Sequence, residues 1–114
     1  MQNLIKIDFL KLANGKIPFL EWLENLDKEI QLRIRYRISK VEIGNFGNTK
    51  ALGKGIYEFK FNFHSGYRIY FGQKEKKIII LINGGNKSSQ KRDIKKALEY
   101  WNYYLQEENI NDER

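Results

Sequence analysis

The sequence predicts a single α+β domain, on the strength of three periodic segments. Residues 56–63 (IYEFKFNF) alternate aromatic and polar side chains, as a half-buried strand does. Residues 26–41 and 94–105 instead repeat apolar residues at helical spacing. The chain has 114 residues, 41% of them hydrophobic, so it can bury one core but not two. We expect the domain to span residues 1–106, followed by a flexible acidic tail at 107–114.

The first part of the chain predicts a strand and a helical hairpin. Residues 4–10 (LIKIDFL) alternate in the manner of a strand. Pro18 suits the first turn of a short helix, and Asp27 can cap the next one. That second helix carries a basic ridge beside its apolar stripe, formed by Arg33, Arg37 and Lys40.

The middle of the chain predicts a glycine-rich loop and a β-hairpin. Residues 44–55 (GNFGNTKALGKG) contain four glycines, which predicts a mobile, ligand-contacting loop carrying Lys50 and Lys54. The strand at 56–63 is expected to turn through His64-Ser65-Gly66, with Gly66 left-handed, into a second strand.

This hairpin predicts a polar cluster. In the expected register Phe63 lies opposite Tyr67, and Lys60 lies opposite Tyr70. Lys60, Arg68 and Tyr70 then share the face that points away from the aromatic core. This cluster is the main functional candidate, with Tyr70 accessible for stacking on an RNA base.

The last part of the chain predicts an interior strand and a terminal helix. Residues 78–82 (IIILI) form a continuous aliphatic run, as expected for a strand that is covered on both faces. The helix that follows can be capped by Ser88 or Ser89, and Asp93 suits the positive end of its dipole.

Composition limits the function classes. The 21 Lys and Arg residues against 14 Asp and Glu give a net charge of +7, which either attracts polyanions or keeps a small domain soluble. There is no cysteine and one histidine, so no disulfide, metal or other cofactor is predicted. The chain shows no membrane-length apolar run and no signal peptide, and a cytoplasmic location is expected.

Three further features have alternative readings. The segment NGGNKSS at 83–89 lacks the spacing of a nucleotide-binding P-loop, but free amides at the helix start and Lys87 could hold one phosphate. Taken in isolation, the segment favours a simple strand-to-helix connection with a solvated Lys87. His64 lies at the expected turn and suits a turn residue better than a catalytic base. Glu58 could act as an acid or base, but we favour a role in holding Lys60 or a neighbouring arginine.

Successive motifs resemble one known family. These are the segments 19–23 (FLEWL), 44–47 (GNFG), 55–60 (GIYEFK), 66–71 (GYRIYF) and 81–90 (LINGGNKSSQ), followed by Asp93, Ile94 and Ala97. In this order they resemble the RelE/ParE superfamily of toxins, and within it the HigB-like addiction-module killer proteins, over about nine-tenths of the chain. Asn86 stands where the family usually has Asp, and Lys60 stands where Arg is common.

The resemblance implies a fold and an activity. The fold is α+β and RelE-like: an antiparallel sheet with an N-terminal strand, a helical hairpin and a C-terminal helix. The activity is metal-independent endoribonuclease cleavage of mRNA, often on the ribosome, which inhibits translation. The partner is a cognate antitoxin, commonly a helix-turn-helix protein. The expected catalytic residues are Lys60, Arg68, Lys87 and Tyr70, and the expected RNA-binding residues are Arg33, Arg37, Lys40, Lys54, Gln90 and Arg92.

Two other functions remain open from the sequence. One is ParE-like inhibition of DNA gyrase, in which the toxin breaks no bond. The other is a basic nucleic-acid-binding module with salt-dependent binding and neither toxicity nor cleavage.

Overall fold

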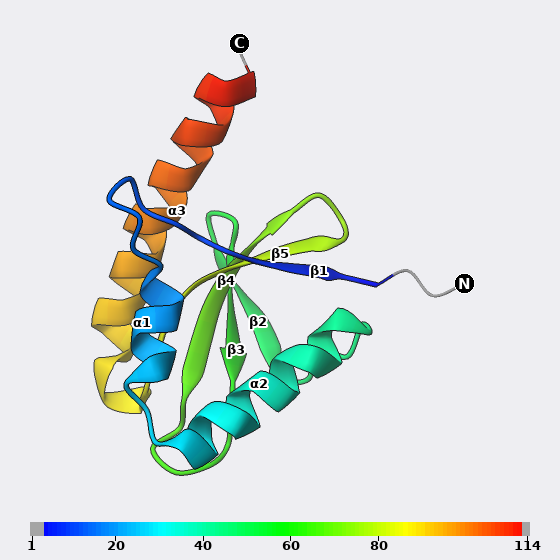
Figure 1. The fold of residues 1–114 in the computed structure, drawn as a ribbon, viewed down its shortest axis with the longest axis vertical. Coiled ribbons are helices and arrows are strands. Elements are labelled where there is room, and N and C mark those ends of the chain that lie inside the picture. The colour runs from blue at the N-terminus through cyan, green and yellow to red at the C-terminus, as the bar shows by residue number, and fades with distance from the viewer. Residues whose placement is uncertain (1–3, 113–114) are drawn as a thin grey trace.

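The computed structural model describes residues 4–112, which form one five-stranded sheet with helices on both faces (Figure 1). The strand order is β1-β5-β4-β3-β2, in which β1 runs parallel to β5 and the other pairs are antiparallel. The elements in chain order are β1 (Lys6–Phe9), α1 (Pro18–Glu24), α2 (Lys28–Glu42), β2 (Thr49–Gly53), β3 (Ile56–Lys60), β4 (Arg68–Lys74), β5 (Ile78–Gly85), the 3₁₀ turn η1 (Lys87–Ser89) and α3 (Gln90–Asp112). The α+β class and its expected elements are confirmed.

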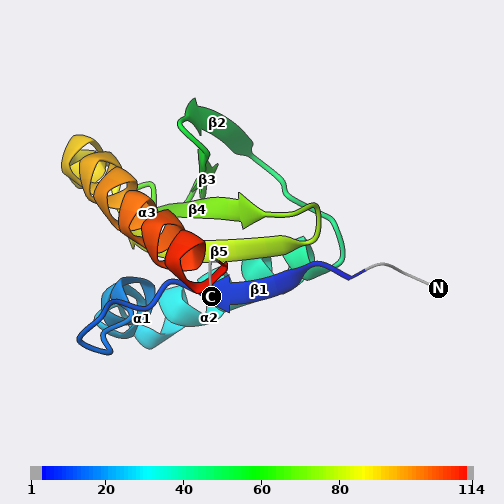
Figure 2. The same cartoon turned by 90° about the horizontal axis from the view of Figure 1, so that it is seen from above.

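Each face of the sheet has its own apolar core. The helical hairpin α1–α2 covers one face, and α3 covers the other, so that the sheet lies between them (Figure 2). The core under α3 contains Tyr70, Ile80 and Trp101. β5 is hydrogen-bonded to β1 and β4 and packs against helices on both faces, so the predicted interior strand is confirmed.

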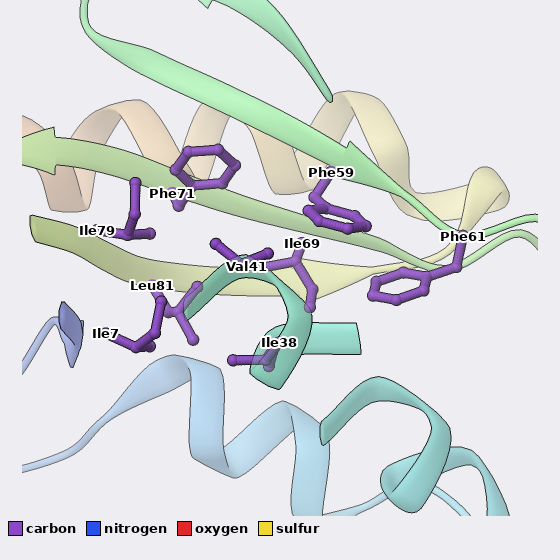
Figure 3. A pocket seen from close by; sticks show the side chains of 9 residues that line it. All are labelled: Ile7, Ile38, Val41, Phe59, Phe61, Ile69, Phe71, Ile79 and Leu81. Carbon is purple, nitrogen blue, oxygen red and sulfur yellow. The ribbon is translucent and has the colours of Figure 1, made fainter. Parts of the chain in front are cut away.

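α2 rests on the sheet through large side chains. Ile38 and Val41 of α2 point toward aromatic and aliphatic residues of the strands (Figure 3). The small space left among them measures about 10 Å³ and has a wholly apolar lining, so it offers no partner to a water molecule. The inner side of α2 is therefore committed to the core, with Ile30, Ile34 and Val41 buried as predicted.

The β3–β4 register differs from the prediction by two residues. Lys60 pairs with Arg68 and Glu58 pairs with Tyr70, so the predicted Lys60–Tyr70 and Phe63–Tyr67 pairs are wrong. The strands end earlier than expected, because residues 61–67 form a longer turn in which Gly66 N donates to Phe63 O at 3.1 Å. Gly66 is left-handed, as predicted, with φ of 68°. A shift of two residues leaves each side chain on its predicted face.

The glycine-rich segment at 44–55 is only partly a loop. Thr49–Gly53 forms the edge strand β2, where the sequence predicts part of a mobile loop. Lys54 and Gly55 make the two-residue turn to β3, with φ of 56° and 87°. Two successive positive φ values match the twist of a tight hairpin, which explains the glycine.

α3 extends beyond the expected end of the domain. It continues to Asp112, and Lys74 Nζ on β4 donates to the Glu108 carboxylate at 2.8 Å. The helix therefore enters the segment expected as an acidic tail, of which residues 113–114 lie outside the described part. The domain boundary at 106 and the flexibility of 107–114 stay predictions.

Candidate functional site

A polar pocket lies on the α3 face of the sheet, where the ends of β2, β3 and β4 meet the start of α3. Its volume is about 360 Å³. The lining residues are Asn48, Lys50, Glu58, Lys60, Arg68 and Gln90. Three cationic side chains and one carboxylate face this space, so the pocket favours an anion.

The pleat of the sheet brings these side chains together. Glu58 and Lys60 are two residues apart on β3 and therefore share a face. Lys60 pairs with Arg68 on β4, and Lys50 pairs with Glu58 from β2. Cross-strand partners have Cβ atoms roughly 5 Å apart, so the cations surround one spot.

Arg68 is held in place by two partners, one of which is itself held by α3. Its side chain is only 7% exposed. Nη1 donates to the carbonyl of Gly66 at 2.8 Å, and Nε lies 3.7 Å from Oε2 of Glu58. Glu58 in turn accepts a 2.8 Å hydrogen bond from Nε2 of Gln90, which opens α3. The expectation that Glu58 holds a neighbouring arginine is confirmed.

Tyr70 lies beneath the pocket and not in it. Its exposed fraction is zero, so the expectation that its ring is accessible for stacking is wrong. The cause is α3, which covers this face of β4 and buries Tyr70 in the second core. Burial, and then the nearby carboxylates of Glu58 and Asp93, raise the pKa of the Tyr70 hydroxyl. The hydroxyl has no hydrogen-bond partner of ordinary geometry among the described residues.

The 3₁₀ turn η1, which leads directly into α3, is capped by Asn86, where the sequence predicts Ser88 or Ser89 as the cap. Asn86 Oδ1 accepts hydrogen bonds from the amides of Ser88 at 3.0 Å and Ser89 at 3.2 Å. The amide of Lys87 donates to Ser65 O at 3.3 Å. These three amides are therefore occupied, and the idea that free amides here hold a phosphate is wrong.

Lys87 does not line the pocket, but it lies close to Arg68. A Cβ placed on Gly66 would lie 3.5 Å from Nη1 of Arg68 and 3.8 Å from Cβ of Lys87. A methyl group at position 66 would therefore touch both Arg68 and Lys87. Lys87 is exposed, so its ammonium is available to a ligand.

A bulge in β5 anchors α3 over this site. The β4–β5 register shifts between Tyr70, which pairs with Asn83, and Phe71, which pairs with Leu81. The shift lets Asn83 reach α3, where its Nδ2 donates to the backbone carbonyl of Asp93 at 3.1 Å. The Asp93 carboxylate accepts from Ser89 Oγ and lies directly over Gly85, where no side chain would fit. These contacts set the position of Gln90.

The other expected RNA-binding residues lie outside the pocket. Arg33 and Arg37 are on α2, on the opposite face of the sheet, and their guanidinium groups lie over aromatic rings at the edge of the core. Lys40 lies over the Tyr36 ring, also on α2. Lys54 is at the tip of the β2–β3 hairpin, and Arg92 lines a separate groove between α1 and α3.

Two lining residues lie outside the expected catalytic and RNA-binding sets, although Lys50 was expected on a ligand-contacting loop. Asn48 and Lys50 enter the pocket because residues 49–53 form a strand, which the sequence analysis did not predict. A two-residue turn at Lys54-Gly55 would by itself place Lys50 opposite Phe59. A register shift between Ala51 and Gly53 moves Lys50 opposite Glu58, and the local sequence pattern does not indicate that shift.

Within residues 4–112, no three His, Cys, Asp or Glu side chains converge as a metal site would require. None of the helices in this part of the chain combines the length and the apolar character of a membrane span.

Comparison with known proteins identifies the family. The chain is 37% identical over 82 residues to an uncharacterised protein of Haemophilus influenzae, an alignment that covers 71% of this chain and 83% of that relative. Residues 21–101 match the model of the phage-derived Gp49-like proteins, also called DUF891, and this range includes every residue that lines the pocket. The chain therefore belongs to the Gp49-like family, a family of toxins of the toxin–antitoxin kind.

Proposed function

We propose that this chain is the toxin of a type II toxin–antitoxin module, of the HigB-like kind within the RelE/ParE superfamily, and that it cleaves mRNA in the cytoplasm. The observation that carries the proposal is the pairing of Lys60 with a pre-oriented Arg68 at the mouth of a cationic pocket. Membership of a toxin family supports it. The partners are mRNA, on or off the ribosome, and a cognate antitoxin of the helix-turn-helix type.

The proposed reaction uses a nucleophile that the RNA itself supplies. The ribose 2′-oxygen attacks the adjacent phosphorus, and the bond from phosphorus to the 5′-oxygen breaks. The products are a 2′,3′-cyclic phosphate and a 5′-hydroxyl. Extra negative charge develops on the phosphate during the attack, and fixed cations that face it lower the barrier. Arg68 is suited to this role because Glu58 and Gly66 hold its guanidinium before the substrate arrives.

Two proton transfers accompany this reaction. One proton leaves the 2′-hydroxyl, and another reaches the departing 5′-oxygen. The proposal gives these transfers to Lys60 and Lys87, which are both exposed and lie near Arg68. Gln90 can donate to the RNA from the pocket wall, and Lys54 and Arg92 would bind more distant phosphates. Tyr70 supports the floor of the pocket and is given no contact with RNA.

The test is a short pulse of expression followed by mapping of transcript 5′ ends across the transcriptome. New 5′ ends that appear within minutes, and that disappear in Lys60→Ala, are the expected result. Intact transcripts with an induced DNA-damage response would replace the nuclease with a gyrase inhibitor. Neither effect, together with salt-dependent nucleic-acid binding, would leave a basic binding module.

A further inference from the structure

The outer side of α2 presents an apolar stripe to solvent. Leu32, Tyr36 and Ile43 are 67%, 60% and 59% exposed. Leu32 and Tyr36 lie on one side of the helix, four residues apart. Ile43, the C-cap residue seven positions further on, continues the same line. The described residues include six exposed large apolar side chains, and the three most exposed of them form this stripe.

The core does not require these three residues. α2 is held to the sheet by its other side, where Ile30, Ile34 and Val41 are buried. The stripe therefore exposes apolar surface to water, which lowers solubility, and it does not contribute to the packing of the domain. An aligned apolar surface of this kind is typical of a binding site for another protein.

The charges around the stripe select the kind of partner. α2 carries five basic residues and two acidic ones, a balance of +3 within its 15 residues. Lys28 and Arg35 flank the stripe on one side. Lys40 and Arg33 flank it on the other side, where Arg33 also forms a 3.7 Å ion pair with Glu29. Lys40 Nζ lies 5.1 Å from the centre of the Tyr36 ring, so charge and apolar surface meet directly. Such a surface complements apolar residues bordered by carboxylates.

We propose that the outer face of α2 docks an acidic amphipathic helix of a protein partner. The partner's apolar residues would cover the stripe formed by Leu32, Tyr36 and Ile43, and its carboxylates would face the flanking cations. On the proposed function, this partner is the antitoxin. α2 and the polar pocket lie on opposite faces of the sheet, so the docked helix leaves the mouth of the pocket open.

Two other occupants fit the surface less well. RNA would pair with the cations but would leave two exposed aliphatic side chains without an apolar partner. A second copy of the chain would bring the two positively charged helices together, which costs electrostatic energy.

The test is peptide binding measured by fluorescence anisotropy. The probe is a labelled peptide of roughly 20 residues, about 30 Å long as a helix, with Leu at every fourth position and Glu beside it. Its control peptide replaces each Leu by Ser and keeps the charge. The triple variant Leu32→Ser/Tyr36→Ser/Ile43→Ser should bind the probe at least about tenfold more weakly, which corresponds to about 1.4 kcal/mol.

A matched variant controls for the loss of any exposed apolar side chain. Leu105 on α3 is 41% exposed, so Leu105→Ser should leave binding of the probe unchanged. Equal affinity of the triple variant and the unchanged chain would overturn the proposal. Equal affinity for both peptides would also overturn it, because charge alone would then explain binding. Self-association that the triple variant abolishes would assign the face to a second copy, and weaker RNA binding without weaker peptide binding would assign it to RNA.

A second arm separates this proposal from the proposed function. Lys60→Ala should bind the probe as the unchanged chain does, because Lys60 lies on the other face of the sheet. In cells, the triple variant should remain toxic and escape neutralisation by the protein encoded beside it. A chain without toxicity would refute the proposed function, yet the peptide result would still decide the docking face.

Discussion

Nε of Arg68 lies 3.7 Å from Oε2 of Glu58, and both side chains are more than nine-tenths buried. The two residues stand on adjacent strands, and Gln90 of α3 donates to the same carboxylate. A pair of this kind costs desolvation energy, which the mutual attraction and the hydrogen bonds offset only while both partners are present. The orientation of the Arg68 guanidinium therefore depends on the presence of Glu58 and on the fold that places the two residues together.

Removal of Arg68 should destabilise the domain as well as affect the site. Arg68→Ala leaves the buried Glu58 carboxylate without its counter-charge, and the free energy of unfolding should fall by about 3–5 kcal/mol. Urea unfolding followed by circular dichroism measures this. The loss of free energy of unfolding in the double variant Glu58→Gln/Arg68→Met should be clearly smaller than the summed losses of Glu58→Gln and Arg68→Met made singly. Additive losses would show that the two side chains do not interact.

Lys60 offers a cleaner test of the site, because it is exposed and its removal leaves no buried charge. Lys60→Ala should reduce RNA cleavage at least about 100-fold, as expected for a residue that transfers a proton or binds the reacting phosphate. The free energy of unfolding should change by no more than about 0.5 kcal/mol. Cleavage of a labelled RNA oligonucleotide is the measurement.

The control for that variant is Lys76→Ala, which removes an equal charge from the turn between β4 and β5. That turn lies at the opposite end of β4 from Arg68. Equal losses in both variants would mean that total charge matters and that Lys60 has no special place.

The Asn86 side chain, which caps the turn leading into α3, should contribute about 1 kcal/mol to the free energy of unfolding. Its side chain accepts from two backbone amides, and Asn86→Ala leaves both without that acceptor. Asn86→Asp should keep these bonds and add a favourable charge at the positive end of the helix dipole. Thermal unfolding of the two variants measures the difference. A Tm for Asn86→Ala equal to that of Asn86→Asp would rule out the cap.

Much of the fold follows from periodicity, because burial on one side leaves a clear pattern. The stripe of α2 and the aliphatic run of β5 were predicted for this reason and are buried as expected. The sequence did not predict β2 because none of its side chains is fully buried. Without a buried face the strand has no apolar alternation, and the glycines near both of its ends favour a loop. The β3–β4 register was missed because alternation fixes which face a residue occupies but not the length of the turn.

The site was predictable only in part, for a related reason. The pleat placed Lys60 and Arg68 on one face from sequence alone, and the structure makes them direct partners. The local sequence pattern of β4 does not indicate that α3 covers Tyr70 and leaves Lys60 at the surface. That distinction depends on where one helix begins, which the Asn86 cap and the Asn83 contact determine.

Tyr70 should make the domain sensitive to alkaline pH. Burial and the nearby carboxylates raise the pKa of its hydroxyl above the ordinary value of 10.0. Below pH 10 the phenol is protonated in the folded and unfolded chains alike, and its contribution does not vary with pH. Above pH 10 only the unfolded chain releases this proton, so the free energy of unfolding falls by up to about 1.4 kcal/mol per pH unit.

The variant Tyr70→Phe should remove that part of the alkaline loss. At neutral pH its stability should equal or exceed that of the unchanged chain, because it deletes a buried hydroxyl that has no hydrogen-bond partner of ordinary geometry. RNA cleavage should persist, since no substrate can reach the ring. The measurement is urea unfolding at several pH values from 8 to 11, with Tyr36→Phe as the control because that ring is 60% exposed. If Tyr70→Phe and Tyr36→Phe show the same slope above pH 10, the Tyr70 hydroxyl does not titrate as its burial requires.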